Sequence, residues 1–178
     1  MEVSTDASGG PFRGVYARGM ATPDFVLALR AKIGTDPLWL PGAIAVVCKD
    51  DLVLMVRRSD TGAWTPVTGI IDPGEQPAAA AVRETLEETG VVADPIRLAS
   101  VDVSGEVVYP NGDRTRFVDL TFRLAWVSGE PYPADGENTE ARWFPRDALP
   151  EMTAEMRTRV DAGLSDEVSA RFKTSPPD

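Results

Sequence analysis

The sequence predicts an α+β fold in which helices cover both sides of one mixed β-sheet. Three observations lead to this prediction. Runs rich in β-branched residues recur between residues 43 and 145, a helical pattern follows the third run, and another helical pattern follows the last. The chain has 178 residues, 43% of them hydrophobic, so it is long enough to bury one core.

The first half of the chain is predicted to contain two helices and three strands. The first helix starts at Thr22, its N-cap, and ends at Gly34. The second helix has Pro77 in its first turn and Gly90 as its C-terminal cap. The strands between them cover residues 43–49, 52–57 and 64–69.

The second half of the chain is predicted to contain three strands and one helix. The strands cover residues 96–109, 117–127 and 141–145, with a break at Gly105 and a turn at residues 110–113. Met152, Met156 and Val160, spaced by four, mark the helix. Residues 172–178 are expected to be a frayed tail.

Composition excludes several classes of function. The net charge of −10 argues against a nucleic-acid polymer or an anionic membrane as partner, although a small phosphorylated ligand stays compatible when metal ions neutralise it. The absence of histidine excludes Ser-His-Asp and Cys-His catalysis and disfavours a zinc site. A single cysteine, Cys48, excludes an intramolecular disulfide. The first residues show no signal-peptide pattern, so a cytoplasmic protein is expected.

One segment combines a glycine turn with a helix rich in carboxylates. Pro73 and Gly74 fit the centre of a type II turn. In the following helix, Glu87 and Glu88 lie three and four residues after Glu84, so these carboxylates repel Glu84 without a cation. Oxygen-rich sites of this kind suit Mg²⁺ or Mn²⁺ acting on a phosphorylated substrate. The alternative is a solvated acidic helix face.

Helical periodicity separates the apolar residues of this helix from its carboxylates. At about 100° per residue, one arc is expected to pack on the sheet and the opposite arc to face solvent or a cleft. The packed arc is predicted to hold Ala79, Val82, Leu86 and Thr89.

The same segment resembles the signature box of the Nudix hydrolases, enzymes acting on a nucleoside diphosphate linked to another group. The pattern is Gly69, five residues, Glu75, seven residues, and then residues 83–91 with the sequence Arg-Glu-Thr-Leu-Glu-Glu-Thr-Gly-Val. Every fixed position matches, while Thr85 occupies a slot that usually holds an aliphatic residue. The resemblance implies an α/β/α sandwich with the box helix beside a mixed central sheet.

The resemblance also implies an organisation of the chain. Residues 1–40 would be an N-terminal extension with one helix, residues 41–165 the Nudix hydrolase domain and residues 166–178 a C-terminal tail. The N-terminal helix is expected to pack on the domain or on a second subunit, so a homodimer is one option.

Metal ligands follow from the resemblance residue by residue. The backbone oxygen of Gly69 and the carboxylates of Glu84, Glu87 and Glu88 are expected to hold the divalent cations, Mg²⁺ or Mn²⁺, and Glu84 and Glu88 count among the catalytic residues. Glu75 and Arg83 are expected to form a structural ion pair across the loop.

A late loop is expected to supply a further carboxylate, as general base or metal ligand. Glu137 is the first choice, because the family has a glutamate some residues before a Trp-Phe pair, here Trp143 and Phe144. Glu140 is the second choice. The alternative is a solvated loop carboxylate.

Four residues are candidates for binding the nucleotide. Arg57 and Arg58 end a strand and can fork onto a diphosphate, unless they are a surface pair at a strand end. Trp64 and Tyr109 can stack on a base, but core packing is the alternative and the favoured one. The nature of the substrate stays open.

The expected reaction is attack of water on a phosphorus of the diphosphate, which releases a nucleoside monophosphate and the phosphorylated remainder. A carboxylate near metal ions would remove the proton of the water. Two alternatives remain. One is a non-catalytic ligand-sensing domain of the same fold, which usually loses carboxylates of the box. The other is diphosphate isomerisation, whose site in the pattern considered needs Cys and His.

Overall fold

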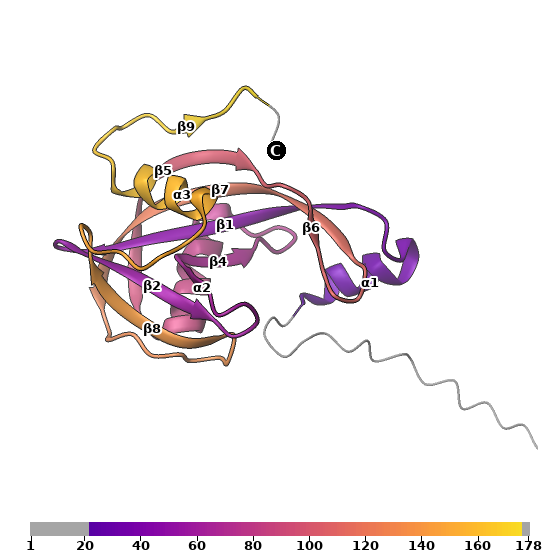
Figure 1. Cartoon of the computed structure of the whole chain (residues 1–178), viewed down its shortest axis with the longest axis horizontal. Coiled ribbons are helices and arrows are strands. Elements are labelled where there is room, and N and C mark those ends of the chain that lie inside the picture. Colours follow the sequence, from indigo (N-terminus) through magenta and orange to yellow (C-terminus); the bar gives the residue numbers. More distant parts are fainter. Residues whose placement is uncertain (1–21, 176–178) are drawn as a thin grey trace, which may run out of the picture.

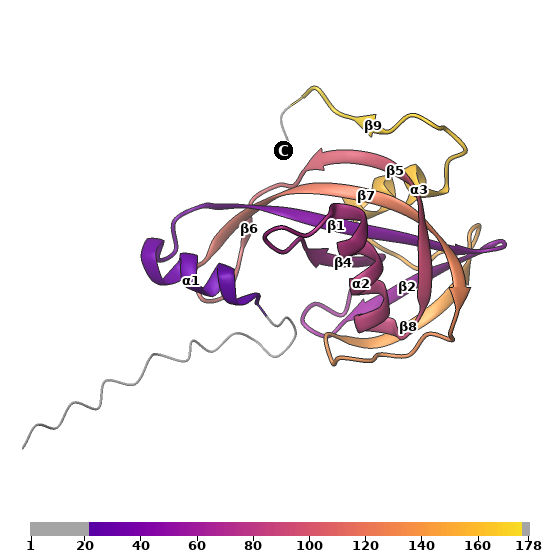
Figure 2. The same cartoon turned by 180° about the vertical axis from the view of Figure 1, so that it is seen from behind.

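The structure is a computed structural model that describes residues 22–175. These residues form an α/β/α sandwich around one mixed sheet, which confirms the predicted fold class (Figure 1). Helix α2 (Pro77–Thr89) covers one face, and helix α3 (Ala154–Leu164) covers the other, as Figures 1 and 2 show from opposite sides. None of the helices in residues 22–175 is both long and apolar enough to cross a membrane.

The centre of the sheet is a long parallel pair. Strand β1 (Leu38–Lys49) runs parallel to β7 (Arg114–Ser128), and β7 pairs antiparallel with β5 (Val92–Val103). The path continues on both sides, in the order β3-β2-β1-β7-β5-β9. The remaining strands are β2 (Leu52–Arg58), β3 (Trp64–Thr65), β4 (Val67–Ile70), β6 (Val107–Val108), β8 (Asn138–Pro145) and β9 (Arg171–Phe172).

Alternation along the strands divides the core into two layers. On β1, Ala43, Ala45 and Val47 pack toward α2 together with Ala80 and Ala81 of that helix. Val46 faces the other way and packs with Val160 of α3. Each residue's position along a strand therefore decides whether it faces α2 or α3.

An arm projects from the body of the sandwich. It consists of helix α1 (Asp24–Ile33), the start of β1, and the hairpin of β6 and β7 (Figures 1 and 2). The buried side chain of Arg30 ties its parts together, because it donates to the carbonyl oxygen of Arg114 at 2.7 Å and to Oγ1 of Thr115 at 3.0 Å.

The predicted order of elements is confirmed, with differences at several ends. The N-cap of α1 is Pro23 rather than Thr22, and β1 starts earlier than residue 43 because its first half pairs with β7. The predicted strand 64–69 is split into β3 and β4 at Pro66, which has no N–H to donate to a ladder. The tail is not entirely frayed, since β9 pairs with β5. Residues 1–21 of the expected extension lie outside the described part.

Candidate active site

The loop in front of α2 is a closed turn. The backbone N–H of Glu75 donates to the carbonyl oxygen of Asp72 at 3.0 Å, and Gly74 has φ of 88°, which a glycine adopts without strain. The predicted turn at Pro73 and Gly74 is thereby confirmed. Gly90 caps the other end of α2 in the left-handed conformation, also as predicted.

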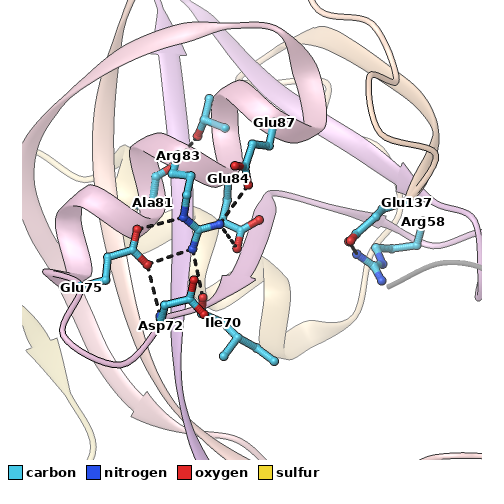
Figure 3. Close-up of polar contacts among 10 residues, drawn as sticks. Arg58, Ile70, Asp72, Glu75, Ala81, Arg83, Glu84, Glu87 and Glu137 are labelled. Carbon is cyan, nitrogen blue, oxygen red and sulfur yellow. Dashed lines mark hydrogen bonds and ion pairs between the residues drawn. The ribbon is translucent and has the colours of Figure 1, made fainter. Parts of the chain in front are cut away.

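Arg83 binds this turn to the helix. Its Nε and Nη2 donate to the two carboxylate oxygens of Glu75, each at 2.9 Å, and Nη2 also reaches the carbonyl oxygen of Ile70 at 3.2 Å (Figure 3). The predicted pair of Glu75 and Arg83 is present. Nη1 of the same arginine contacts Glu84 and Glu87, each at 2.9 Å, so one cation compensates three carboxylates.

Helix α2 is rotated about its axis relative to the predicted orientation. Leu86 and Ala79 are exposed rather than packed on the sheet. The buried residues are Ala80, Ala81, Thr85, Glu88 and Thr89. The small side chains let the helix lie close to the sheet, and the hydroxyls of Thr85 and Thr89 donate to carbonyl oxygens one turn earlier. This packing brings one carboxylate of the box, that of Glu88, into the interior.

Glu88 is fully buried, with a relative accessibility of 0%. Its Oε2 accepts a hydrogen bond of 2.7 Å from Nδ2 of Asn138, whereas its Oε1 has no hydrogen-bond partner among the described residues. Burial, together with the negative charges of Glu137 and Glu84, raises the pKa of Glu88 to about 8, although the hydrogen bond from Asn138 opposes the shift. A buried carboxylate oxygen without a partner is the kind of group that a cation compensates.

Glu84 lies against strand β4. A Cβ at Gly69 would collide with the side chain of Glu84, so the absence of a side chain at residue 69 allows this close approach. Burial raises the pKa of Glu84 to about 7, although Arg83 opposes the shift. Gly69 and Glu84 thus lie together, as the sequence predicted.

The late loop brings Glu137 to the α2 side of the sheet, near Glu84 and Glu88. Its Oε2 is 3.7 Å from Nη1 of Arg58, and its charge is close enough to raise the pKa values of Glu84 and Glu88. Glu140 has a different position: it pairs with Arg57 at 3.0 Å. Side chains two residues apart on a strand share a face. In β2, Arg57 therefore lies on the α3 side with Met55, and Arg58 lies on the α2 side with Val56.

The candidate nucleotide-binding residues are therefore divided between the two faces. Arg58 is buried on the α2 side, and its charge reaches Tyr109. Burial raises the pKa of Tyr109 above its usual value, and the charge of Arg58 opposes this shift. Trp64 packs edge-on against Phe144, with ring centroids 4.9 Å apart, in the layer under α3. The structure thus brings Arg58 to the face of the box carboxylates, with Tyr109 within reach of the charge of Arg58, and it leaves Arg57 and Trp64 on the opposite face.

The carboxylates fit a divalent cation, but they do not converge on one point. Among residues 22–175, no three acidic, Cys or His side chains are arranged to hold a metal ion. The reason is visible in Figure 3, where Glu84 and Glu87 turn toward Arg83, while Glu137 lies beside Arg58. The unpartnered Oε1 of the fully buried Glu88 is the position where positive charge is missing.

Without a divalent cation, the folded protein should lose stability as the pH rises. Glu84 and Glu88 have pKa values of about 7 and 8 in the folded chain, against 4.5 when unperturbed. A carboxyl with a raised pKa in the folded state contributes stability that is complete below the unperturbed pKa and is lost as the pH rises through the folded pKa. In EDTA, the melting midpoint should therefore fall by several degrees between pH 5 and pH 8.5.

Mg²⁺ should restore much of this loss. Binding to the native state at about a hundredfold over the Kd adds about 2.7 kcal/mol to the free energy of unfolding. Glu88→Gln is the control, and its midpoint in EDTA should change much less with pH. Equal pH dependence of Glu88→Gln and the original protein would contradict the assignment.

Comparison with known proteins adds independent information. The family model for the NUDIX domain matches residues 39–163. The NAD-capped RNA hydrolase NudC of Pseudomonas aeruginosa (strain LESB58) is 32% identical over 121 residues, which make up 67% of this chain and 41% of that protein. The MutT-like protein of Streptomyces ambofaciens is 34% identical over 111 residues, or 62% of this chain and 66% of that protein. The chain matches less than half of the length of NudC.

Solved structures agree on the fold. A NUDIX hydrolase from Nitrosomonas europaea has a TM-score of 0.60 at 18% identity, covering 75% of this chain and 76% of that one. A UDP-X diphosphatase has a TM-score of 0.59 at 18% identity, covering 86% and 74%. The family match spans most of the sheet, both covering helices and the complete box. The chain therefore belongs to the Nudix hydrolase family.

Proposed function

We propose that the protein is a metal-dependent hydrolase that cleaves the diphosphate of a nucleoside diphosphate linked to another group. The observation that carries this proposal is Glu88, which is fully buried between α2 and the sheet and whose Oε1 has no hydrogen-bond partner among the described residues. Glu84 lies close enough to act on its charge and shares the guanidinium of Arg83 with Glu75 and Glu87. Buried charge without a partner is costly unless a ligand supplies the opposite charge. Members of this family generally work with a divalent metal ion, which fits that requirement.

We assign the metal to Mg²⁺ or Mn²⁺, held by the backbone oxygen of Gly69 and by the carboxylates of Glu84, Glu87 and Glu88. When bound, such an ion stabilises charge on phosphate oxygens and makes water more acidic. Glu87 is half exposed, and an exposed i,i+4 ion pair such as the one with Arg83 is weak, so its side chain is free to turn toward an ion.

Glu137 is proposed to take the proton of the attacking water. Its carboxylate lies 3.7 Å from the guanidinium of Arg58, the group proposed to hold the diphosphate, so the base would lie beside the bound substrate. Arg58 would bind the diphosphate, since a guanidinium matches two phosphate oxygens at once. Tyr109 is proposed to contact the nucleobase. The products would be a nucleoside monophosphate and the phosphorylated remainder.

The names of similar proteins support a small nucleotide as substrate. They include an NAD-capped RNA hydrolase, an 8-oxo-dGDP phosphatase from Mus musculus and a UDP-X diphosphatase. The shared chemistry of these names is a diphosphate attached to a nucleoside. The net charge of −10 disfavours a nucleic-acid polymer as partner.

The proposed activity is tested with a panel of nucleoside diphosphate derivatives, including sugar nucleotides and dinucleotides, in Mg²⁺ and in Mn²⁺. We expect release of a nucleoside monophosphate from at least one compound. Glu88→Gln should lower kcat by about two orders of magnitude or more, because it removes charge that matters in the transition state. A folded Glu88→Gln protein with near-normal turnover would refute the assignment of Glu88.

The two candidates of the late loop are separated by a matched pair of variants. Glu137→Gln should lower kcat far more than it raises KM, because removal of the water's proton belongs to the transition state. Glu140→Gln should be mild, because Glu140 pairs with Arg57 on the other face of the sheet. If Glu140→Gln were the impaired variant, Glu140 would have to be the loop residue that acts.

The neighbouring arginines of β2 provide a second matched pair. Arg58→Ala should raise KM about tenfold or more, since hydrogen bonds to charged groups contribute about 1.5–3 kcal/mol. Arg57→Ala should change KM less than about twofold, because an exposed ion pair such as Arg57 with Glu140 contributes little. Circular dichroism of both variants would check the fold, and equal KM values would contradict the role of Arg58.

A further inference from the structure

Asn138 lies on the face of α2 because of an irregularity in β8. Strand β8 pairs with β2 in a regular register from Leu52↔Pro145 to Arg57↔Glu140, and the register then shifts so that Arg58 pairs with Asn138. Thr139 is the extra residue of this bulge. With uninterrupted alternation, Thr139 would face α2 and Asn138 would face α3. The bulge turns Asn138 toward the box helix instead, as bulges near functional sites commonly do.

The backbone around Asn138 is held from both sides. The carbonyl oxygen of Glu137 accepts hydrogen bonds from the backbone N–H of Ser59 at 3.0 Å and from its hydroxyl at 2.7 Å. The hydroxyl of Thr139 donates to the carbonyl oxygen of Arg57 at 3.2 Å. The two hydrogen bonds from Ser59 hold the backbone just before Asn138, and the register shift sets the direction in which the side chain of Asn138 leaves the strand.

The side chain of Asn138 ends on Glu88. Asn138 is 4% exposed and Glu88 is 0% exposed, and Nδ2 donates to Oε2 at 2.7 Å. Both remaining oxygens of this pair, Oδ1 of Asn138 and Oε1 of Glu88, are buried without a hydrogen-bond partner among residues 22–175. When Glu88 is ionised, each of these oxygens is an acceptor, so neither satisfies the other, and both suit a ligand that brings positive charge or donors.

The type of donor matters for a carboxylate that binds a cation. Arginine at this place would neutralise Glu88 and compete with the metal, as Arg83 does for Glu84 and Glu87. The amide of Asn138 donates one hydrogen bond without adding a charge. It therefore orients the carboxylate, keeps its negative charge and leaves Oε1 open.

We propose that Asn138 is a positioning residue for Glu88, which it holds through Oε2 so that Oε1 faces the metal site. The bulge in β8 is the feature that brings it there. This inference rests on the proposed function in one respect, the role of Glu88 as a metal ligand. Groups of this kind, which orient a ligand from behind, change metal affinity by about 10–100-fold when they are removed.

The test measures binding of Mn²⁺ alone to the full chain by calorimetry, and the melting midpoint in EDTA and in Mg²⁺. Asn138→Leu keeps a similar volume but has no donor, and Asn138→Ala is a second variant in case leucine does not fit. Thr139→Val is the matched control, since it removes a neighbouring hydroxyl that contacts only the backbone of Arg57.

We expect Asn138→Leu and Asn138→Ala to weaken Mn²⁺ binding about 10–100-fold, and Thr139→Val to leave it within about twofold. The stabilisation by a given Mg²⁺ concentration should shrink in the same order. A purely structural role would lower the midpoints in EDTA and in Mg²⁺ equally and leave the Mn²⁺ affinity unchanged, which would overturn the inference. If the original protein bound neither ion, the proposed function itself would fail, and the two failures are thus distinguishable.

Discussion

The site depends on one constraint, the burial of carboxylates between α2 and the sheet. Glu88 is fully covered and Glu84 mostly so, and burial raises the pKa values of both. Few positive charges face them. Arg83 pairs with Glu84 but is shared with Glu75 and Glu87, and the contact that Glu88 receives from Asn138 is neutral. The small residues at the α2–sheet interface and the glycine at residue 69 let Glu88 and Glu84 lie close to the sheet, and the bulge in β8 brings the amide of Asn138 onto Glu88.

Strand alternation separates a chemical face from a supporting face. On the α2 side lie the box, Arg58 and Glu137. On the α3 side, Asp119 is buried with Arg159, whose Nη2 donates to Oδ2 at 2.6 Å. Here a carboxylate has a full counter-charge from the protein itself, although burial still raises the pKa of Asp119 to about 6. The contrast between Asp119 and Glu88 shows that the fold compensates buried charge where no ligand is needed.

Short spacings along the chain made part of the candidate site predictable from the sequence. The turn at Pro73 and Gly74, the limits of α2 and the pair of Glu75 and Arg83 depend on residues a few positions apart, and the structure has all of them. The predicted packing of α2 is confirmed for Val82 and Thr89 and wrong for Ala79 and Leu86, because Ala80, Ala81 and Thr85 make the closest approach to the sheet. Asn138 was missed, since its direction depends on a register shift between β2 and β8 that no local pattern reveals.

Tyr109, the proposed contact for the nucleobase, is held by a different part of the chain. Tyr109 sits at the tip of the β6–β7 hairpin, where its N–H donates to the carbonyl oxygen of Asp113 at 2.9 Å. Arg30 of α1 lies 3.6 Å from the carboxylate of Asp113 and also binds the first residues of β7. Helix α1 precedes the part matched by the family model. The turn that carries Tyr109 is therefore held partly by a helix outside the matched residues, so relatives with the same box can differ at this turn.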